Sequence, residues 1–307
     1  MSAEAAPLKT NLPVPKKQPD SPWRIAIRRF SRNRLAVIGL IIIVFMFLLC
    51  FIGPLFSPYS LYDYSVKDKN LPPSAKYWLG TDKLGRDVLL RMMLAGRISL
   101  TVGLVATGIS VIVGATLGAL AGFYRKWVDT LIMRIADIFM AIPTLPILII
   151  LGAVLSDLKV DPSERIYFLM LIIGILGWSG ISRLVRGQIL TLREQEFMQA
   201  TEALGLKDRR KIFRHLLPNT IPIIIVSATL GVAGAIIYES ALSFLGVGVV
   251  PPTPSWGNMI SAANSLIDFR KRPWLWIPPG MCILVTVVAI NLIGDGLRDA
   301  LDPKMKK

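Results

Sequence analysis

The sequence predicts an all-α integral membrane protein with six transmembrane helices and a helical loop in the cytoplasm. Three observations predict this class. Hydrophobic residues make up 53% of the 307 residues and charged residues 18%, which is too apolar for a soluble protein of this length. Six uncharged runs are each long enough to cross a hydrocarbon layer of roughly 30 Å as a helix. A polar, basic segment at 183–218 separates the fourth run from the fifth.

The predicted spans are the runs at 35–62, 98–124, 138–156, 166–182, 216–238 and 273–294. The amphipathic stretch before the third run contains Asp129, Arg134 and Asp137, so we expect it to lie along the cytoplasmic surface or to face protein. Pro143 and Pro146 remove intrahelical hydrogen bonds from the third span. This span should therefore be kinked and face protein or a cavity, which makes both prolines candidates for a translocation path.

The second span and the stretch before it carry two further patterns. Gly114, Gly118 and Gly122 recur at four-residue spacing, which puts small residues on one helix face and predicts close packing against another helix. The stretch at 87–97 alternates charged residues with Leu and Met at helical spacing. We expect this stretch to lie flat on the outer surface.

Basic residues indicate the orientation. Five arginines and no acid lie at 24–34, eight Lys or Arg lie at 183–218, and three lysines lie at 304–307. With six spans these segments share one side, so the positive-inside rule places both termini in the cytoplasm. The net charge of +15 then reflects topology, and nucleic acid is not an expected partner.

The chain divides into five predicted parts. They are a disordered cytoplasmic leader at 1–22, a juxtamembrane segment with the first span at 23–56, an external loop at 57–97, a five-helix core at 98–303 that includes a helical loop at 190–218, and a cytoplasmic tail at 304–307. A second external segment at 246–272 is rich in Pro, Gly and Trp, and we expect it to form a cap or a docking rim.

The sequence does not predict an enzyme. It contains no glycine-rich phosphate-binding loop, so any nucleotide would be hydrolysed by another chain. His215 is the single histidine, and Cys50 and Cys282 both fall inside predicted spans, which supports neither a metal site nor a disulfide. Asp82 and Asp87 have basic neighbours and are expected to be structural.

Glu239 follows more than twenty uncharged residues near the outer end of the fifth span. A charge in a span usually faces protein or water, because exposure to lipid is costly. Two interpretations stay open: Glu239 has a structural pairing or interfacial role, or it lines the translocation path.

The second half of the basic segment predicts a surface for a partner protein. Phe197, Ala200, Ala203 and Leu204 lie on one face of a predicted helix, and Gly205 can end that helix. A short charged helix follows, and Pro218 opens the next span. This connection is longer than the usual 2 to 8 residues between helices, so we expect a partner to cover its apolar face.

The same stretch resembles the cytoplasmic coupling loop of bacterial ABC importer permeases, with the pattern Glu-Ala-Ala, three residues, Gly, nine residues, Ile, one residue, Leu-Pro. The matching positions are Gln199-Ala200-Thr201, Gly205, His215 and Leu217-Pro218; Gln199, Thr201 and His215 depart from the pattern. The stretches at 79–87, 239–246, 251–257 and 294–303, with Arg28-Arg29-Phe30, resemble the C-type permease subunit of dipeptide and oligopeptide importers.

This resemblance implies a type I ABC importer permease fold in a bacterial inner membrane. It implies a heterodimer with a homologous permease, two ATPase subunits that use ATP and magnesium, and an extracytoplasmic peptide-binding protein, with no cofactor or metal on this chain. The residues implied in ATPase coupling are Glu196, Phe197, Ala200, Thr201, Ala203, Leu204, Gly205, Arg209, Arg210 and Pro218. Those implied in docking of the binding protein are Asp82, Arg86, Asp87, Pro252 and Trp256. Those implied on the translocation path are Pro143, Pro146 and Glu239.

Import of oligopeptides or dipeptides is the expected function. Import of a nickel chelate or another small solute on the same scaffold is the alternative. A secondary transporter would need more ionisable residues in its spans, where Glu239 is the one candidate. A membrane-embedded enzyme would need a catalytic pair at matched depth, which the sequence lacks.

Overall fold

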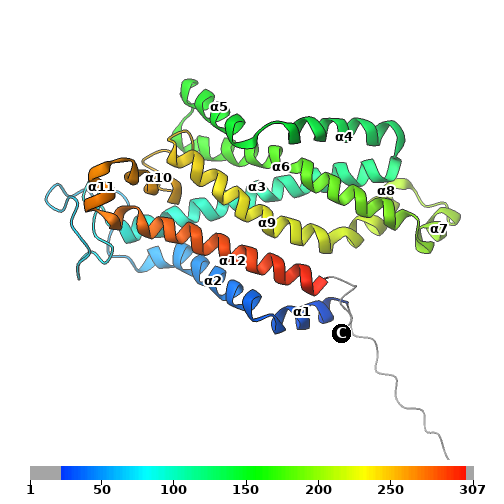
Figure 1. Cartoon of the computed structure of the whole chain (residues 1–307), viewed down its shortest axis with the longest axis horizontal. Coiled ribbons are helices and arrows are strands. Elements are labelled where there is room, and N and C mark those ends of the chain that lie inside the picture. Colours follow the sequence, from blue (N-terminus) through cyan, green and yellow to red (C-terminus); the bar gives the residue numbers. More distant parts are fainter. Residues whose placement is uncertain (1–21, 302–307) are drawn as a thin grey trace, which may run out of the picture.

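The computed structural model describes residues 22–301, which form an all-helical structure whose long helices run along one axis (Figure 1). The helices are α1 (Pro22–Arg32), α2 (Arg34–Phe51), α3 (Val88–Tyr124), α4 (Lys126–Ala141), α5 (Thr144–Asp157), α6 (Pro162–Arg193), α7 (Glu196–Ala203), α8 (Asp208–Arg210), α9 (Leu217–Phe244), α10 (Trp256–Ile260), α11 (Leu266–Lys271) and α12 (Ile277–Leu301). The predicted tail at 304–307 and the predicted leader, apart from Pro22, lie outside the described residues.

Five segments of the described chain are long and apolar enough to cross a membrane as single helices. They are α2, α3, α6, the continuous stretch Asp208–Phe244 that ends in α9, and α12. The pair α4 and α5 supplies a sixth span if its two halves are counted together. The prediction of an all-helical membrane protein is therefore confirmed, and the third span is the one that is not a single helix.

The third span bends by 82° between α4 and α5. Ile142 and Pro143 have extended backbone there, and Pro143 precedes the first residue of α5. Pro146 lies in the first turn of α5, where a backbone N–H has no intrahelical partner to lose. The predicted interruption is thus confirmed, but it comes from Pro143 alone and is a break between two helices.

The helix pair α3 and α6 forms the centre of the molecule. A Cβ on Gly114 would lie 2.6 Å from the Trp178 carbonyl oxygen, and a Cβ on Gly118 would lie 2.3 Å from that of Ser182. Only glycine permits this approach, so the packing predicted for the small face of α3 is confirmed. The helices α9 and α12 pack beside this pair, and α2 packs on α12.

The stretch at 87–97 is not a separate surface helix, so that prediction is wrong. Asp87 caps α3 by accepting a hydrogen bond from the Leu90 backbone N–H at 2.7 Å, and α3 then runs unbroken to Tyr124. Arg97 donates to the carbonyl oxygens of Cys50 and Phe51, both at 2.8 Å. The charged residues of this stretch therefore face neighbouring elements of the chain, which is why the alternating pattern looked like a surface helix.

The two ends of the molecule differ in what they carry (Figure 1). At one end lies a helical loop at 194–216 that contains α7 and α8, which we call the α7 loop. At the other end the residues 57–91 and 246–276, including α10 and α11, form a folded layer that we call the cap. Both α1 and the end of α12 lie toward the α7 loop.

Candidate functional sites: the α7 loop, the cap and a groove

The α7 loop has a defined turn at the end of its first helix. Gly205 has a φ of +65°, the left-handed conformation that favours glycine. The Gly205 N–H donates to the Glu202 carbonyl at 2.9 Å, and the Leu206 N–H donates to the Thr201 carbonyl at 3.2 Å. This pair of bonds is the Schellman arrangement that ends many helices. A Cβ on Gly205 would meet no atom within 4 Å, so backbone conformation and not crowding selects glycine here.

One face of α7 is anchored in the core of the chain. Met198 is buried in a cluster with Ile189 of α6 and with Ile212 and Leu216 beyond α8. Thr201 is buried on the same face and donates its hydroxyl to the Met198 carbonyl at 2.7 Å. Thr201 was expected to touch an ATPase, but its burial turns it toward its own chain, where it positions the helix.

The opposite face of α7 is exposed. Ala200 and Ala203 are exposed, and the Leu204 side chain is 75% exposed at the end of the helix. Phe197 belongs to neither face fully, because it is half-buried against the core cluster. The remaining residues expected to contact an ATPase are exposed around these positions: Glu196, Gly205, Arg209, Arg210 and Pro218.

A π-helix at Lys211–Leu216 joins the α7 loop to α9. Pro218 has no N–H to donate to the Arg214 carbonyl, which favours a wider turn at this point. The Asn219 side chain donates instead to the His215 carbonyl at 2.5 Å. Pro218 is evident in the sequence, but the sequence alone does not show whether a π-helix or an ordinary first turn precedes it.

Ion pairs join α6 to α4, and a hydrogen bond joins the end of α6 to the end of α3. Arg186 of α6 donates to both carboxylate oxygens of Asp129 at 2.6 Å, and Arg183 pairs with Asp137. The Arg193 guanidinium donates to the Phe123 carbonyl at 2.5 Å, where α3 ends. Of the two alternatives for the stretch before the third span, the one in which it faces protein is therefore confirmed. Arginines on α6 bind the chain itself, whereas Arg209 and Arg210 stay exposed.

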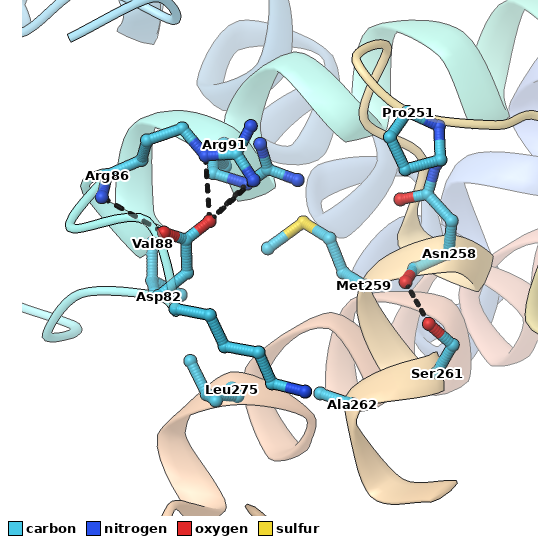
Figure 2. Close-up of a pocket in the computed structure, with 11 residues that line it drawn as sticks. Asp82, Arg86, Val88, Arg91, Pro251, Asn258, Met259, Ser261, Ala262 and Leu275 are labelled. Carbon is cyan, nitrogen blue, oxygen red and sulfur yellow. Dashed lines mark hydrogen bonds and ion pairs between the residues drawn. The ribbon is translucent and has the colours of Figure 1, made fainter. Parts of the chain in front are cut away.

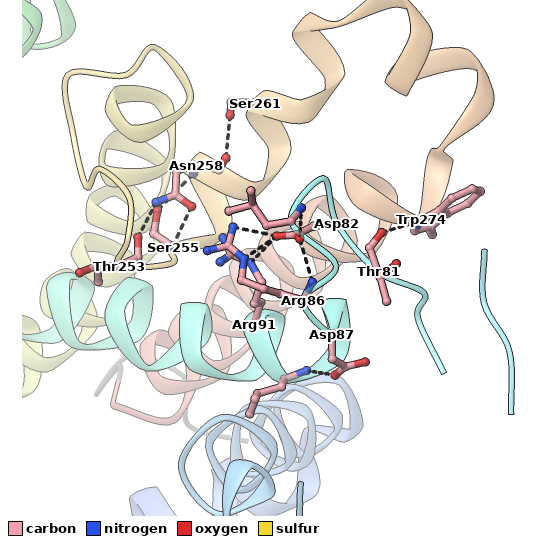
Figure 3. A network of polar contacts seen from close by, with 12 residues as sticks. Thr81, Asp82, Arg86, Asp87, Arg91, Thr253, Ser255, Asn258, Ser261 and Trp274 are labelled. Carbon is pink, nitrogen blue, oxygen red and sulfur yellow. Dashed lines mark hydrogen bonds and ion pairs between the residues drawn. The ribbon is translucent and has the colours of Figure 1, made fainter. Parts of the chain in front are cut away.

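The cap joins segments that are far apart in the sequence (Figure 3). The Thr81 hydroxyl accepts a hydrogen bond from the Leu71 N–H at 2.8 Å, and the Trp274 indole N–H donates to the Thr81 carbonyl at 3.4 Å. Asp268 lies 2.8 Å from the Lys83 ammonium and 2.6 Å from the Arg272 guanidinium. Burial of Asp268 favours its neutral form, but Lys83 and Arg272 together lower the pKa of this carboxyl.

The residues expected to dock a binding protein divide into buried and accessible ones. Trp256 is 0% exposed and donates its indole N–H to the Met92 carbonyl at 3.1 Å. Asp87 is buried as the cap of α3. Direct docking contacts are therefore wrong for Trp256 and Asp87, which hold the cap on α3. Pro252 is exposed, and Asp82 and Arg86 are half-buried as an ion pair.

Glu239 is a structural residue in the described chain. Its side chain is fully buried, and it accepts hydrogen bonds from the hydroxyls of Ser99 at 2.8 Å and Ser243 at 2.7 Å. The Val249 N–H donates to the Ser243 hydroxyl, and the Trp256 N–H donates to the Ser99 hydroxyl. The structural alternative therefore fits, because this network connects α3, α9 and the cap. The path role of Glu239 stays a prediction, and neither cavity of the groove described next has Glu239 in its wall.

A groove runs between α6 and α9. A cavity of about 290 Å³ opens between these helices, α3 and α5, and a larger one of about 640 Å³ continues toward the α7 loop, with Ser227 in the wall of both. Hydroxyl-bearing and small residues line the first cavity: Thr107, Ser110, Thr144, Gly177, Gly180, Gly231 and Gly234 among others. Among the described residues that line the two cavities, Arg298 is the one charged residue.

The groove overlaps only partly with the residues expected on a translocation path. Neither Pro143 nor Pro146 lines it, although Thr144 between them does. The Thr107 hydroxyl is buried and has no hydrogen-bond partner among the described residues. Gly180 and Gly234 have open space where a side chain would lie.

Within residues 22–301 no three His, Cys, Asp or Glu side chains are placed to hold a metal ion.

These features define a multi-pass helical membrane protein with a projecting helical loop at one end and a groove between its spans. Residues 114–307 match the family described as binding-protein-dependent transport system inner membrane component, and residues 21–73 match the N-terminal transmembrane domain of oligopeptide transport permease C. The chain belongs to this family of binding-protein-dependent inner membrane components.

Relatives match over almost the whole chain. The dipeptide transport system permease protein DppC of Alkalihalophilus pseudofirmus is 42% identical over 98% of both chains. The oligopeptide transport system permease protein OppC of Bacillus subtilis is 40% identical over 93% of this chain and 90% of its own. The glutathione transport system permease protein GsiD of Pectobacterium atrosepticum is 37% identical over 96% of both. The resemblance inferred from the sequence motifs is confirmed.

Proposed function

We propose that this chain is one of two membrane subunits of an ATP-driven importer that moves oligopeptides or dipeptides into a bacterial cytoplasm. The observation that carries the proposal is the match to the dipeptide permease of Alkalihalophilus pseudofirmus over 98% of both chains. The other partners are a homologous permease, two ATPase subunits and an extracytoplasmic peptide-binding protein. ATP and magnesium bind to the ATPase subunits and not to this chain.

In this proposal the α7 loop faces the cytoplasm and the cap faces outward. The arginines and lysines at 183–218 support this orientation, because basic loops are retained in the cytoplasm. Both α1 and the end of α12 lie toward the α7 loop, which supports cytoplasmic termini. The protein is then a multi-pass component of the inner membrane.

The α7 loop transmits the motion of the ATPase subunit. The exposed Ala200, Ala203 and Leu204 enter a groove on that subunit, and Arg209 and Arg210 make charge contacts at its rim. Such rim charges contribute more to association rate than to affinity. Because Met198 and Thr201 hold the other face of α7 in the core, a displacement of the loop moves α6 as well.

The groove between α6 and α9 serves as this chain's half of the substrate route. A partly exposed hydroxyl such as that of Ser227 can exchange hydrogen bonds with a peptide backbone, which is common to all peptides. The glycines leave room for side chains of different sizes. A wall with little charge would not select particular side chains, so selection falls to the binding protein.

The function is tested with the complete transporter in proteoliposomes. This chain, the second permease and the ATPases should copurify, and the vesicles should accumulate a labelled peptide only with ATP and the binding protein. Loss of the ATPases on purification, or uptake without ATP, would contradict the proposal. Uptake of a nickel chelate in place of peptide would assign the alternative cargo.

Leu204→Ser tests the contact on α7. Burying a leucine contributes about 1.5–3 kcal/mol, so this variant should lose ATPase retention by roughly tenfold or more. The thermal stability of the chain should not change, because Leu204 is exposed in the chain itself. Leu266→Ser, at an exposed leucine of α11 in the cap, is the matched control and should retain the ATPases.

A further inference from the structure

A recess in the cap contains an arginine whose charge is only partly neutralised. The recess has a volume of about 260 Å³. Figure 2 shows Asp82, Arg86 and Arg91 on one side of it and Asn258 and Ser261 on the other. Arg91 lies in the first turn of α3 and is 8% exposed.

The charges around this recess do not balance. Asp82 accepts a hydrogen bond from Arg86 Nε at 2.8 Å and forms an ion pair with Arg86 Nη2 at 2.7 Å. The same carboxylate lies 3.5 Å from Arg91 Nε, and Arg91 Nη1 has no hydrogen-bond partner among the described residues. Lys83 also lines the recess, and its partner Asp268 is shared with Arg272. Arg86 and Arg91 likewise share Asp82, so positive groups outnumber carboxylates around the recess.

We propose that the recess receives the carboxylate of an Asp or Glu side chain on the extracytoplasmic binding protein. A buried charge without a full partner is costly, and a carboxylate that enters the recess supplies the missing negative charge. Guanidinium and carboxylate groups also match in geometry, which makes their hydrogen bonds among the strong ones. This inference rests on the proposed function, because it assumes that a binding protein docks on the cap.

The shape of the recess favours a docked side chain over a transported peptide. Its floor is formed by Val88, Met259 and Leu275, which are buried members of one apolar cluster. It shares no lining residue with the groove between α6 and α9. The recess is therefore separate from the groove proposed for the cargo. Pro251 and the segment from Asp82 to Arg91 border it, so it lies between the two loops expected to meet the binding protein.

The first experiment measures the Kd of the binding protein for the complete transporter in nanodiscs. Arg91→Gln should weaken binding by roughly tenfold or more, because it removes one partner of a desolvated charge pair. Lys69→Gln is the matched control, since it removes the same charge from an exposed position in the same loop. It should change the Kd by less than about twofold, as expected for an exposed charge.

A second variant tests the recess without removing the arginine. Ala262→Trp should fill the cavity from the wall that Ala262 lines and weaken binding to a similar degree. If Arg91→Gln fails to assemble with the other subunits, the Kd measured with Ala262→Trp tests the inference by itself. An unchanged Kd in an assembled variant of either kind would overturn the inference while leaving the proposed function intact.

The source of the carboxylate is tested with the cargo. The binding protein is used empty, loaded with a peptide, and loaded with the same peptide as its C-terminal amide. The inference expects Arg91→Gln to weaken binding equally in all three states. A loss confined to the free-acid peptide would assign the carboxylate to the cargo and overturn it. Failure of the wild-type transporter to bind the binding protein would overturn the proposed function itself.

Discussion

The α7 loop and the cap are both polar, turn-rich connections between spans, but different contacts hold them in shape. In the α7 loop the shaping hydrogen bonds join near neighbours, such as Leu206 to Thr201. In the cap they join distant residues, such as Trp274 to Thr81 and Lys83 to Asp268. The turn that ends α7 is closed locally, although Met198 anchors the helix in the core, whereas the shape of the cap depends on contacts among distant segments.

This difference matches what each region is proposed to do. A locally closed element keeps its shape when it is displaced, which suits a part that is pushed by another subunit. A layer held by long-range contacts loosens as a unit when one contact is removed, because its segments do not stabilise themselves. Substitutions in the cap should therefore reduce stability, and substitutions in the α7 loop should reduce transport.

The largest effect on stability is expected for Trp256→Ala. Trp256 is fully buried between α3 and the cap, and loss of a buried tryptophan costs about 3–5 kcal/mol. Thermal unfolding of the purified transporter in detergent would measure this loss. Trp78→Ala is the control, because Trp78 is 73% exposed in the same region. Equal midpoints of thermal unfolding for the two variants would contradict the view that the buried Trp256 side chain stabilises the cap.

The next effect is expected for Gly205→Val in the α7 loop. A left-handed φ costs a non-glycine residue about 1–2 kcal/mol, so the turn after α7 should distort and ATP-driven uptake should fall. Unfolding temperature should fall by no more than this strain explains, because no atom lies where the new side chain would begin. Gly205→Asn is the matched control, since asparagine tolerates this conformation, and it should retain most uptake. Native uptake by an assembled Gly205→Val transporter would show that α7 does not couple.

The smallest effect is a loosening of the cap in acid. The pKa of Asp268 is lowered in the folded protein, so its stabilising contribution is present above the pKa of the unfolded chain and is lost as the pH falls through the lower folded value. Hydrogen exchange of the amides at 79–86 should therefore rise below about pH 4. Asp268→Asn should remove this pH dependence, whereas Asp157→Asn, at an exposed position, should not. An unchanged acid profile in Asp268→Asn would show that this carboxylate does not tie the cap.

The sequence predicted the features that depend on local pattern. The uncharged runs located the spans, Pro143 located the break between α4 and α5, and three glycines located the close packing of α3 on α6. The α7 helix and its glycine turn were also predicted, because amphipathic spacing and a C-terminal glycine act over only a few residues.

The features that were missed depend on which elements meet. A charged stretch such as 87–97 has the same sequence pattern whether its charged side chains contact water or another helix. Its continuity with α3 was therefore not predicted. Burial of Trp256 and Glu239 follows from contacts with Met92 and Ser99, which lie 164 and 140 residues earlier in the chain. The partly neutralised charge of Arg91 appears only when its distance to Asp82 is known.

The break at Pro143 has a consequence for how many independent parts the third span contains. α4 is tied to α6 by two ion pairs, and α5 carries Thr144 in the wall of the groove. No helical hydrogen bond ladder crosses Ile142 and Pro143, so the two halves are joined by a few rotatable bonds. A rotation there changes the angle between α4 and α5 without unwinding either one. The third span is thereby jointed, with ion pairs holding α4 on α6 and apolar packing around Leu148 holding α5.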